Sequence, residues 1–362
     1  MINNIKNHFF NLMPYGLLVK MRGKRYKASN ILKLDPTISN IPQTDSQYKH
    51  IVSVQGFGFS GSGAVVDLLR EFSNCLVLGS IDSEGSVTKG DRHINGEIDF
   101  LRHSGGFFEI ERFLDDNNQF FKDALIKRFV RLVNSDAIFR DEKMAFLINQ
   151  FYNQIIDFEI DTKGHCDYNW HISNNMYPDA NIKVMKRFGV DEYRNICRKF
   201  LVSFFNLLYK KNYSHLVLDQ LCGDMNFDFE KYQSYIPNLK LILVYRDPRD
   251  TYSYAIMKDV PWIPHDNVNN FIKWYNINIQ KLDLNSKSYL AVRFEDLIFK
   301  YKDTTSLIES YLNLMPENHT RPFECLNPEE SAKNIALWKN LPKYKQDMGI
   351  IYKSLKDYCI VS

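Results

Sequence analysis

A glycine-rich turn between a strand-like run and an amphipathic helix constrains the fold of this chain more than any other stretch. Residues 52–69 read VSVQGFGFSGSGAVVDLL, so an apolar run ends at Gly56 and the turn holds three further glycines and two serines. The next apolar residues recur at the spacing of one helix face: Val65, Leu68, Leu69 and Phe72. Because such a turn directs unpaired N–H groups and the positive end of a helix at one point, the stretch predicts an anion-binding loop.

The turn by itself is compatible with more than one kind of loop. A nucleoside-triphosphate loop of the Walker A type would carry Lys and then Ser or Thr after its last glycine, whereas Ala64 follows Gly63 here. A dinucleotide fingerprint fits the spacing of Gly56, Gly58 and Gly61, but no lone acidic residue stands out about twenty positions later. A glycine-rich turn that binds nothing is the third interpretation.

Two later segments narrow the choice. Residues 239–245 (LKLILVY) have the pattern of a buried strand and run directly into RDPRD at 246–250. Residues 289–292 (YLAV) have the same pattern and run into RFEDL at 293–297. In this order and spacing, the three segments resemble the sulfotransferases that use 3′-phosphoadenosine 5′-phosphosulfate (PAPS), over roughly residues 50–340.

The resemblance implies an α/β, P-loop-like three-layer fold with a central, mainly parallel sheet flanked by helices. The residue pattern favours the same class, because strand-like runs alternate with amphipathic helices along the chain. We expect a basic N-terminal segment and linker at 1–49 and a sulfotransferase domain at 50–362. Residues 105–160 show helical patterns, and we expect a helical insertion on the acceptor side over roughly 105–195.

The resemblance also implies where the donor binds. The glycine turn matches the family's 5′-phosphosulfate loop, and the segment at 246–250 matches its 3′-phosphate segment. Sulfuryl transfer has a loose transition state, so backbone N–H groups and hydroxyls supply most of the catalysis, and no metal is required. The expected PAPS-binding residues are Gly58, Phe59, Ser60, Gly61, Ser62, Gly63, Ala64, Arg246, Ser253 and Lys333.

Two positions depart from the family pattern. Many relatives carry Lys or Arg in the loop where this chain has Phe59, so we expect either a larger role for backbone donors or a replacement cation: Lys89, Arg92 or Lys333. Many relatives also carry a serine eight residues after the arginine that matches Arg246, where this chain has Tyr254. We expect the neighbouring Ser253 to take that role.

The other charged residues of these segments have a structural interpretation. We expect Arg249 and Asp250 to form a salt-bridged turn, and the charged residues at 293–296 to form framework ion pairs, since such networks are common. Residues 333–339 (KNIALWK) resemble the family's late nucleotide-capping segment, although its usual glycines are absent.

A general base has to accept the proton of the acceptor hydroxyl. Glu84 is the first candidate, because it lies in a polar loop after the short strand pattern at 75–78, and loops at the carboxyl ends of parallel strands form ligand sites. Asp82, His93 and Asp219 are the alternatives, and a solvated carboxylate is the competing interpretation of the acidic ones. The expected catalytic residues are Glu84, Ser60 and Asp219.

Composition argues against several other classes. The formal net charge of +3 does not indicate a nucleic-acid-binding protein. The six cysteines are scattered without a C-x-x-C pair, which favours reduced thiols in a cytoplasmic protein over a disulfide framework or a zinc site. No apolar run approaches the length of a transmembrane helix.

The N-terminal segment has a charge pattern of its own. Residues 1–27 hold six Lys or Arg residues among apolar ones and no acid. The segment could lie on an anionic membrane surface or bind a partner, and a solvated tail with an apolar anchor is the alternative interpretation. Residues 13–18 (MPYGLL) resemble the leaders of bacterial surface-polysaccharide enzymes.

Together these features predict a cytoplasmic PAPS-dependent sulfotransferase that moves a sulfuryl group to a hydroxyl of a glycan or polysaccharide precursor. Peripheral contact with the inner face of the membrane, through residues 1–27, is part of this prediction. The alternatives are a P-loop-like kinase or nucleotide hydrolase and a non-catalytic protein that binds a nucleotide or a glycan.

Overall fold

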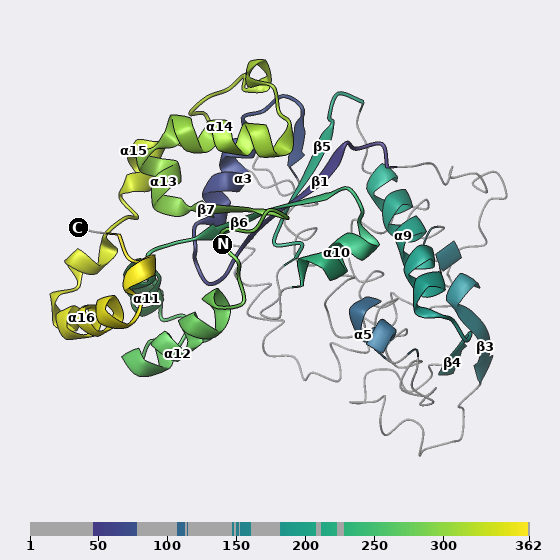
Figure 1. Cartoon of the computed structure of the whole chain (residues 1–362), viewed down its shortest axis with the longest axis horizontal. Coiled ribbons are helices and arrows are strands. Elements are labelled where there is room, and N and C mark those ends of the chain that lie inside the picture. The colour runs from purple at the N-terminus through teal and green to yellow at the C-terminus, as the bar shows by residue number, and fades with distance from the viewer. Residues whose placement is uncertain are drawn as a thin grey trace, which may run out of the picture.

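A parallel five-stranded sheet lies at the centre of the molecule (Figure 1). The computed structural model describes residues 46–77, 107–112, 114, 147, 150–151, 153–160, 182–207, 211–222 and 228–360. The strand order is β2-β5-β1-β6-β7 and every neighbouring pair is parallel. The bounds are β1 His50–Gly56, β2 Cys75–Val77, β5 His215–Asp219, β6 Leu239–Tyr245 and β7 Leu290–Arg293.

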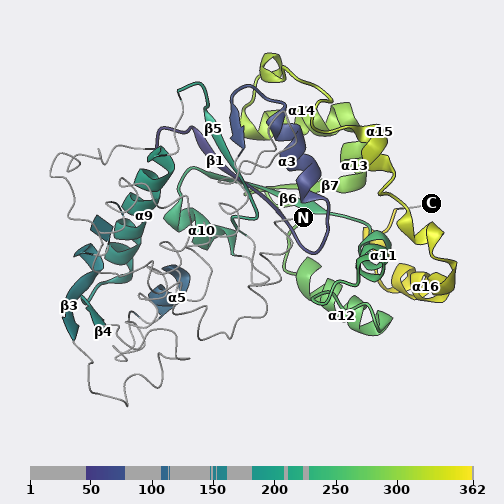
Figure 2. The same ribbon diagram turned by 180° about the vertical axis from the view of Figure 1, so that it is seen from behind.

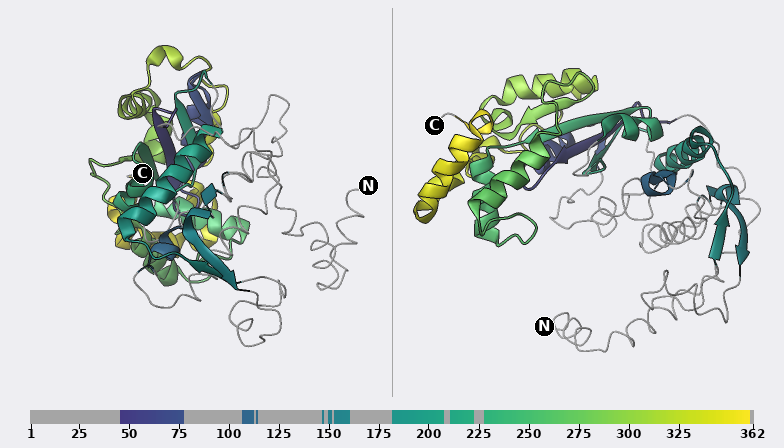
Figure 3. Two further views of the ribbon diagram at one scale, coloured as in Figure 1. Left: turned by 90° about the vertical axis from the view of Figure 1, so that its right-hand side faces the viewer. Right: turned by 60° about the horizontal axis from the view of Figure 1, so that its bottom comes forward.

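Helices cover both faces of this sheet, because side chains of successive strand residues point to opposite faces. Val52 and Val54 of β1 pack with Leu68, in the layer of α3 (Ser62–Arg70), α13 (Phe294–Phe299) and α14 (Tyr301–Leu312). Ile51 packs on the other face with α5 (Phe107–Arg112), α9 (Val190–Leu207) and α10 (Phe229–Tyr235). Figure 2 shows this arrangement from behind, and Figure 3 shows it in two further views. The predicted α/β class with a mainly parallel central sheet is confirmed.

A third group of helices packs beyond the end of β6. It consists of α11 (Pro248–Lys258), α12 (Val268–Ile279) and α16 (Lys345–Ser354), whose core includes Phe271 and Tyr275. The remaining elements of this half are α15 Pro328–Ala332 and the 3-10 turns η4 Pro316–Asn318, η5 Leu337–Asn340, η6 Pro342–Tyr344 and η7 Lys356–Tyr358.

The predicted helical insertion is not wholly helical. Helix is present in the described residues at α5 and at 147, 150–151 and 153–155, but β3 (Ile156–Ile160) and β4 (Ile182–Met185) form a separate antiparallel pair. The prediction of helices through residue 160 is therefore wrong at its end. The sequence IDFEI at 156–160 alternates apolar and acidic residues, which is the period of a strand.

Two further features belong to the described residues as a group. No helix among them is both long enough and apolar enough to cross a bilayer. The described cysteines Cys75, Cys197, Cys325 and Cys359 are free thiols, and all of these but Cys325 are buried.

Two histidines lie side by side at the amino-terminal edge of the sheet. His50 of β1 is opposite His215 of β5, and their ring centres are 5.3 Å apart. Both ring nitrogens of His50 are buried. Burial, and then the charges of His215, Lys240 and Lys49, lower the pKa of His50 to about 4.

We expect this pair to make the fold sensitive to acid. Between pH 6.5 and about 4 the unfolded chain protonates His50 while the folded chain does not, so stability falls as the pH falls through this window. The loss is on the order of 1–2 kcal/mol after a discount for solvent screening, and denaturant titrations at several pH values measure it.

The variant His50→Gln should flatten the dependence of the free energy of unfolding on pH. His265→Gln, which removes a surface histidine whose pKa is raised by a backbone hydrogen bond, should not. Equal slopes in wild type and His50→Gln would contradict this assignment.

Candidate functional site

Three neighbouring strands bring the candidate site together at one edge of the sheet. β1 lies between β5 and β6, with Val54 opposite Asp219 and Gly56 opposite Val244. The glycine loop, Asp219 and Arg246 therefore lie at the carboxyl ends of adjacent parallel strands. Open α/β sheets bind their ligands at this edge.

The loop between β1 and α3 is a tight turn with left-handed backbone at three residues. The φ angle is +52° at Gly58, +56° at Phe59 and +91° at Gly61, which is also the N-cap of α3. A side chain at Gly58 would meet Trp274, and one at Gly61 would meet Phe294. Conformation and packing therefore both require glycine at these two positions.

The turn leaves hydrogen-bond donors at the start of α3. The backbone N–H groups of residues 58–61 have no partner among the described residues, and Ala64 N donates to the Gly61 carbonyl at 3.0 Å. The side chain of Ser60 is turned against Gly56, and its buried hydroxyl also has no partner in the described part of the chain. Because a buried hydroxyl without a partner costs about 1–3 kcal/mol, a ligand with acceptor oxygens fits this loop.

Arg246 connects the loop to two segments that are distant in sequence. Its side chain is buried, and Nη1 donates to the carbonyl oxygen of Phe59 at 3.3 Å. Nη2 donates to the carbonyl oxygen of Asn334. The guanidinium also lies over the Phe294 ring, 5.1 Å from its centre. The buried Nε has no partner among the described residues, so its N–H is left for a ligand.

Buried carboxyl groups surround Arg246. Asp250 Oδ2 lies 3.9 Å from Arg246 Nη2. Burial lowers the pKa of Arg246 and raises the pKa of Asp250, although the attraction between the two charges acts in the opposite direction on both pKa values. Glu295 Oε1 accepts a hydrogen bond from the backbone N–H of Asp247 at 2.9 Å. Burial raises the pKa of Glu295 to about 7. The environment of Arg246 therefore becomes more positive as the pH falls through neutrality.

The RFEDL segment at 293–297 contacts both the glycine loop and the RDPRD segment at 246–250. The Phe294 ring lies against Gly61 on one side and Arg246 on another, and Glu295 holds the backbone of Asp247. The three segments that resemble one family in sequence thus form one packed unit. Its centre is an aromatic ring that the sequence analysis did not assign to the site.

Arg249 has a different partner from the expected one. Its Nε and Nη2 donate to both carboxylate oxygens of Asp247, at 3.1 and 2.7 Å, and Nη2 also donates to the Ile360 carbonyl at 2.8 Å. The predicted pairing with Asp250 is therefore wrong. Asp247 is the N-cap of α11 and accepts from Arg249 N, so its carboxylate lies beside the Arg249 side chain. Trp338 stacks on the same guanidinium at 4.4 Å.

The late segment at 333–339 reaches the site through its backbone. The Asn334 carbonyl accepts a hydrogen bond from Arg246 Nη2. The backbone N–H of Ala336 donates to Asp250 Oδ2 at 2.8 Å. Lys333 itself is exposed and forms an ion pair with Glu330 at 2.5 Å. In this arrangement the Lys333 side chain faces a carboxylate on the surface.

The structure gives Ser253 and Tyr254 different surroundings. The buried hydroxyl of Ser253 donates to the Arg249 carbonyl of its own helix at 2.7 Å. The Tyr254 ring packs on the Phe59 ring, with centres 4.4 Å apart. The two positions at which this chain departs from the family pattern are therefore in contact with each other.

Two glutamines that the sequence analysis did not assign to the site connect Asp219 to the loop. Gln220 Nε2 donates to Ser62 Oγ at 2.9 Å and to Asp219 Oδ1 at 3.3 Å, and Gln55 Nε2 donates to Gln220 Oε1 at 2.6 Å. Burial raises the pKa of Asp219, which makes the carboxylate a better proton acceptor. The signal in the sequence was the position of Gln220 directly after a strand.

The roles of several predicted site residues stay predictions. Glu84 lies outside the described residues, as do the alternative bases and cations Asp82, Lys89, Arg92 and His93. At the start of α3, Gly63 is exposed and Ala64 is half-buried.

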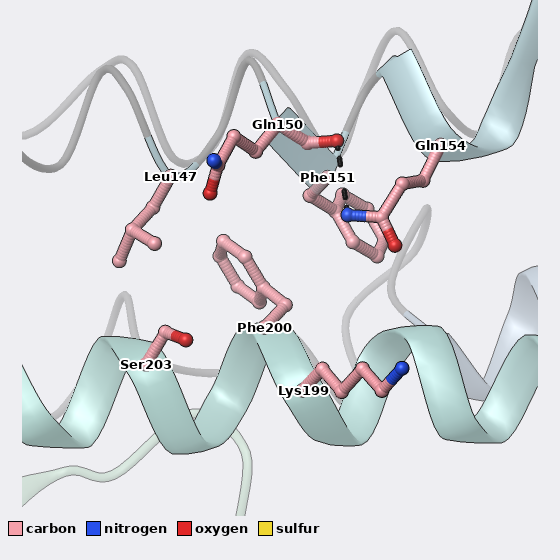
Figure 4. Close-up of a pocket in the computed structure, with 7 residues that line it drawn as sticks. All are labelled: Leu147, Gln150, Phe151, Gln154, Lys199, Phe200 and Ser203. Carbon is pink, nitrogen blue, oxygen red and sulfur yellow. Dashed lines mark hydrogen bonds between the residues drawn. The ribbon is translucent and has the colours of Figure 1, made fainter. Parts of the chain in front are cut away.

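A small pocket lies away from this edge of the sheet, between α9 and the helical residues 147, 150–151 and 153–154 (Figure 4). Its volume of about 10 Å³ is close to the space of one water molecule. Lys199 is the one ionisable side chain that lines it. Within the described part of the chain, no group of three or more His, Cys, Asp or Glu side chains is arranged to hold a metal ion.

Comparisons with known proteins give weak likenesses. No family model matches the sequence. The chain is similar to the sulfotransferase STF9 from Mycobacterium avium, with 8% identity and a TM-score of 0.36, over 89% of this chain and 78% of that one. It is also similar to the sulfotransferase domain of the olefin synthase from Synechococcus PCC 7002, with 12% identity and a TM-score of 0.36, over 88% and 98%. At this level neither structure assigns a function, so the function has to be argued from the residues of the site.

Proposed function

We propose that this chain is a PAPS-dependent sulfotransferase that acts on a hydroxyl of a glycan or polysaccharide precursor. The observation that carries the proposal is the contact of Arg246 Nη1 with the Phe59 carbonyl oxygen, at 3.3 Å. This contact joins the glycine loop at the start of α3 to the buried guanidinium of Arg246. A nucleotide with one anionic group on its 5′ side and another on its 3′ side needs two such elements within its own length.

In the proposed reaction, the acceptor oxygen bonds to sulfur while the bond from sulfur to the bridging phosphate oxygen breaks. The N–H groups of residues 58–61 and the positive end of α3 stabilise the charge that moves onto the leaving phosphate. Arg246 binds the 3′-phosphate with its free donor. Asp219, at the end of β5, accepts the hydroxyl proton, and Glu84 is the alternative base.

The cation that replaces the loop lysine is, in this proposal, Arg246. Its guanidinium already contacts the loop backbone at Phe59, whereas Lys333 is paired with Glu330. Its positive charge therefore also offsets the negative charge on the leaving phosphate.

A second candidate is a protein that binds the nucleotide without turnover. The Ser253 hydroxyl is engaged by its own helix, and an aromatic ring occupies the loop position where many relatives carry a cation. Both observations reduce the number of groups available to the donor. A P-loop kinase or hydrolase has less support, because the Lys and Ser or Thr that would bind a triphosphate and its magnesium are absent after Gly63.

Titration of the full-length chain with 3′-phosphoadenosine 5′-phosphate (PAP), the desulfated product, tests the proposal. We expect PAP to bind at least tenfold more tightly than ATP with magnesium, because only PAP offers a 3′-phosphate to Arg246. Calorimetry gives both affinities. Labelled PAPS with a panel of polysaccharides then separates turnover from binding alone. Preference for ATP would contradict the proposal, and PAP binding without transfer to any acceptor would favour the second candidate.

The glycan acceptor, the cytoplasmic location and the membrane or partner contact of residues 1–27 are parts of the same proposal. They rest on the sequence features given above, and residues 1–27 lie outside the described part of the chain.

A further inference from the structure

Three aromatic rings form a partly exposed stack beside the glycine loop. Phe59 lies between Tyr254 and Trp262, with ring centres 4.4 Å and 5.4 Å away, and it is nearly parallel to Trp262, at 25°. Phe59 is 38% exposed and Trp262 is 56% exposed. We call these three residues the aromatic platform.

The surrounding structure holds this platform in place. Phe59 has φ of +56°, which is unusual and costly for a bulky side chain. Its carbonyl is bound by Arg246, and Ile263, next to Trp262, is buried against Gly58. The fold therefore fixes an aromatic ring in an unfavourable backbone conformation and leaves more than a third of it exposed.

The position of the platform determines which part of a reaction it can serve. Phe59 belongs to the loop whose N–H groups are proposed to hold the sulfuryl end of the donor, so a ring on Phe59 or Trp262 lies beside the transferred group. The donor base is separated from that group by the phosphate and the ribose. The platform is therefore better placed for the acceptor.

Exposure indicates the chemical class of that acceptor. Small apolar or phenolic ligands are usually enclosed in concave pockets that bury most of their surface. Here Phe59 and Trp262 are open to solvent, Tyr254 is half-buried, and the ammonium of Lys258 lies 6.0 Å over the Tyr254 ring. An open aromatic surface with a cation at its edge suits a hydrated ring with an apolar face and an acidic substituent, and this describes a sugar of an acidic polysaccharide.

We propose that the aromatic platform is the acceptor subsite, on which a sugar ring of an acidic polysaccharide stacks and presents its hydroxyl to the glycine loop. This inference rests on the proposed sulfuryl transfer and adds its substrate class. Trp262 supplies the exposed stacking face, Phe59 supports the other face of that ring, and Lys258 supplies charge.

Binding of an unsulfated chondroitin hexasaccharide to the full-length chain, with cellohexaose and 4-nitrophenol as comparison probes, tests this inference. We expect the acidic hexasaccharide to bind most tightly. Trp262→Ala should weaken it about tenfold, the loss of one stacked ring, while Trp262→Phe should stay within about threefold of wild type. Phe158→Ala is the matched control, because Phe158 is 53% exposed and belongs to β3, outside the platform. PAP affinity should be unchanged in all three variants.

Other results would overturn the inference. It is wrong if the hexasaccharide does not bind, if Trp262→Ala binds it as wild type does, or if 4-nitrophenol alone depends on Trp262. It is also wrong if Trp262→Ala weakens PAP, because the platform would then hold the donor base. Failure of the proposed function is a separate result: PAP does not bind, whether or not the hexasaccharide binds in a Trp262-dependent way.

Discussion

Arg246→Ala is expected to weaken PAP binding by about 30- to 4,000-fold. Truncation of one partner of a buried, charge-assisted contact costs about 2–5 kcal/mol, and each 1.4 kcal/mol is a factor of ten. The variant removes the donor proposed for the 3′-phosphate and the contact that holds the Phe59 carbonyl. Calorimetric titration with PAP measures the loss. Arg246→Lys keeps the charge without the fork and should lose about tenfold.

Arg198→Ala is the matched control for this prediction. Arg198 of α9 is half-buried and, like Arg246, donates to backbone: its Nε and Nη2 donate to the Ser234 carbonyl, at 3.2 and 2.7 Å. Thermal denaturation has to accompany both titrations, because Arg246→Ala leaves Asp250 buried without its ion-pair partner. PAP affinity equal to that of wild type in folded Arg246→Ala would remove the main support for the proposed donor site.

The sequence predicted the central sheet well because its signals are local. The apolar run at 239–245 coincides with β6, and the glycines after Gly56 mark the turn into α3. Buried parallel strands read as continuous apolar runs, and a left-handed turn needs glycine wherever a side chain would collide. Neither inference requires knowledge of a distant part of the chain.

The partners within the site were predicted less well because they depend on tertiary packing. Nothing local to Arg249 distinguishes Asp247 from Asp250, and the choice follows from the geometry of the α11 cap. The bond from Gln220 to Ser62 joins residues 158 positions apart. In the sequence, Phe294 is an ordinary aromatic residue at the end of a strand. Its contact with Gly61 is a feature of the tertiary structure alone.

Gly61→Ala is expected to have the second large effect, since it acts on both conformation and packing. Alanine at φ of +91° carries a left-handed backbone cost of about 1–2 kcal/mol. The added methyl group also meets the Phe294 ring, and overpacking of a core typically costs about 1–3 kcal/mol. We expect the free energy of unfolding to fall by about 2–5 kcal/mol, measured by denaturant titration.

The same substitution should also abolish PAP binding in the molecules that remain folded. Phe294 lies between Gly61 and Arg246, so a displaced ring moves the guanidinium as well as the loop. Titration with PAP well below the melting temperature separates this effect from unfolding. Loss of stability with PAP affinity intact would show that the loop packs on Phe294 for structural reasons alone.

Gly63→Ala distinguishes a requirement for this particular glycine from a general sensitivity of the loop. Gly63 lies two residues further on, in the first turn of α3, and an added methyl group there has no atom within 4 Å. Alanine in a helix is favoured over glycine by about 0.5–1 kcal/mol, so stability should stay level or rise slightly. PAP affinity should stay within about threefold of wild type, because the backbone donors are unchanged. If Gly63→Ala were as damaging as Gly61→Ala, the left-handed turn against Phe294 could not be what shapes the anion site.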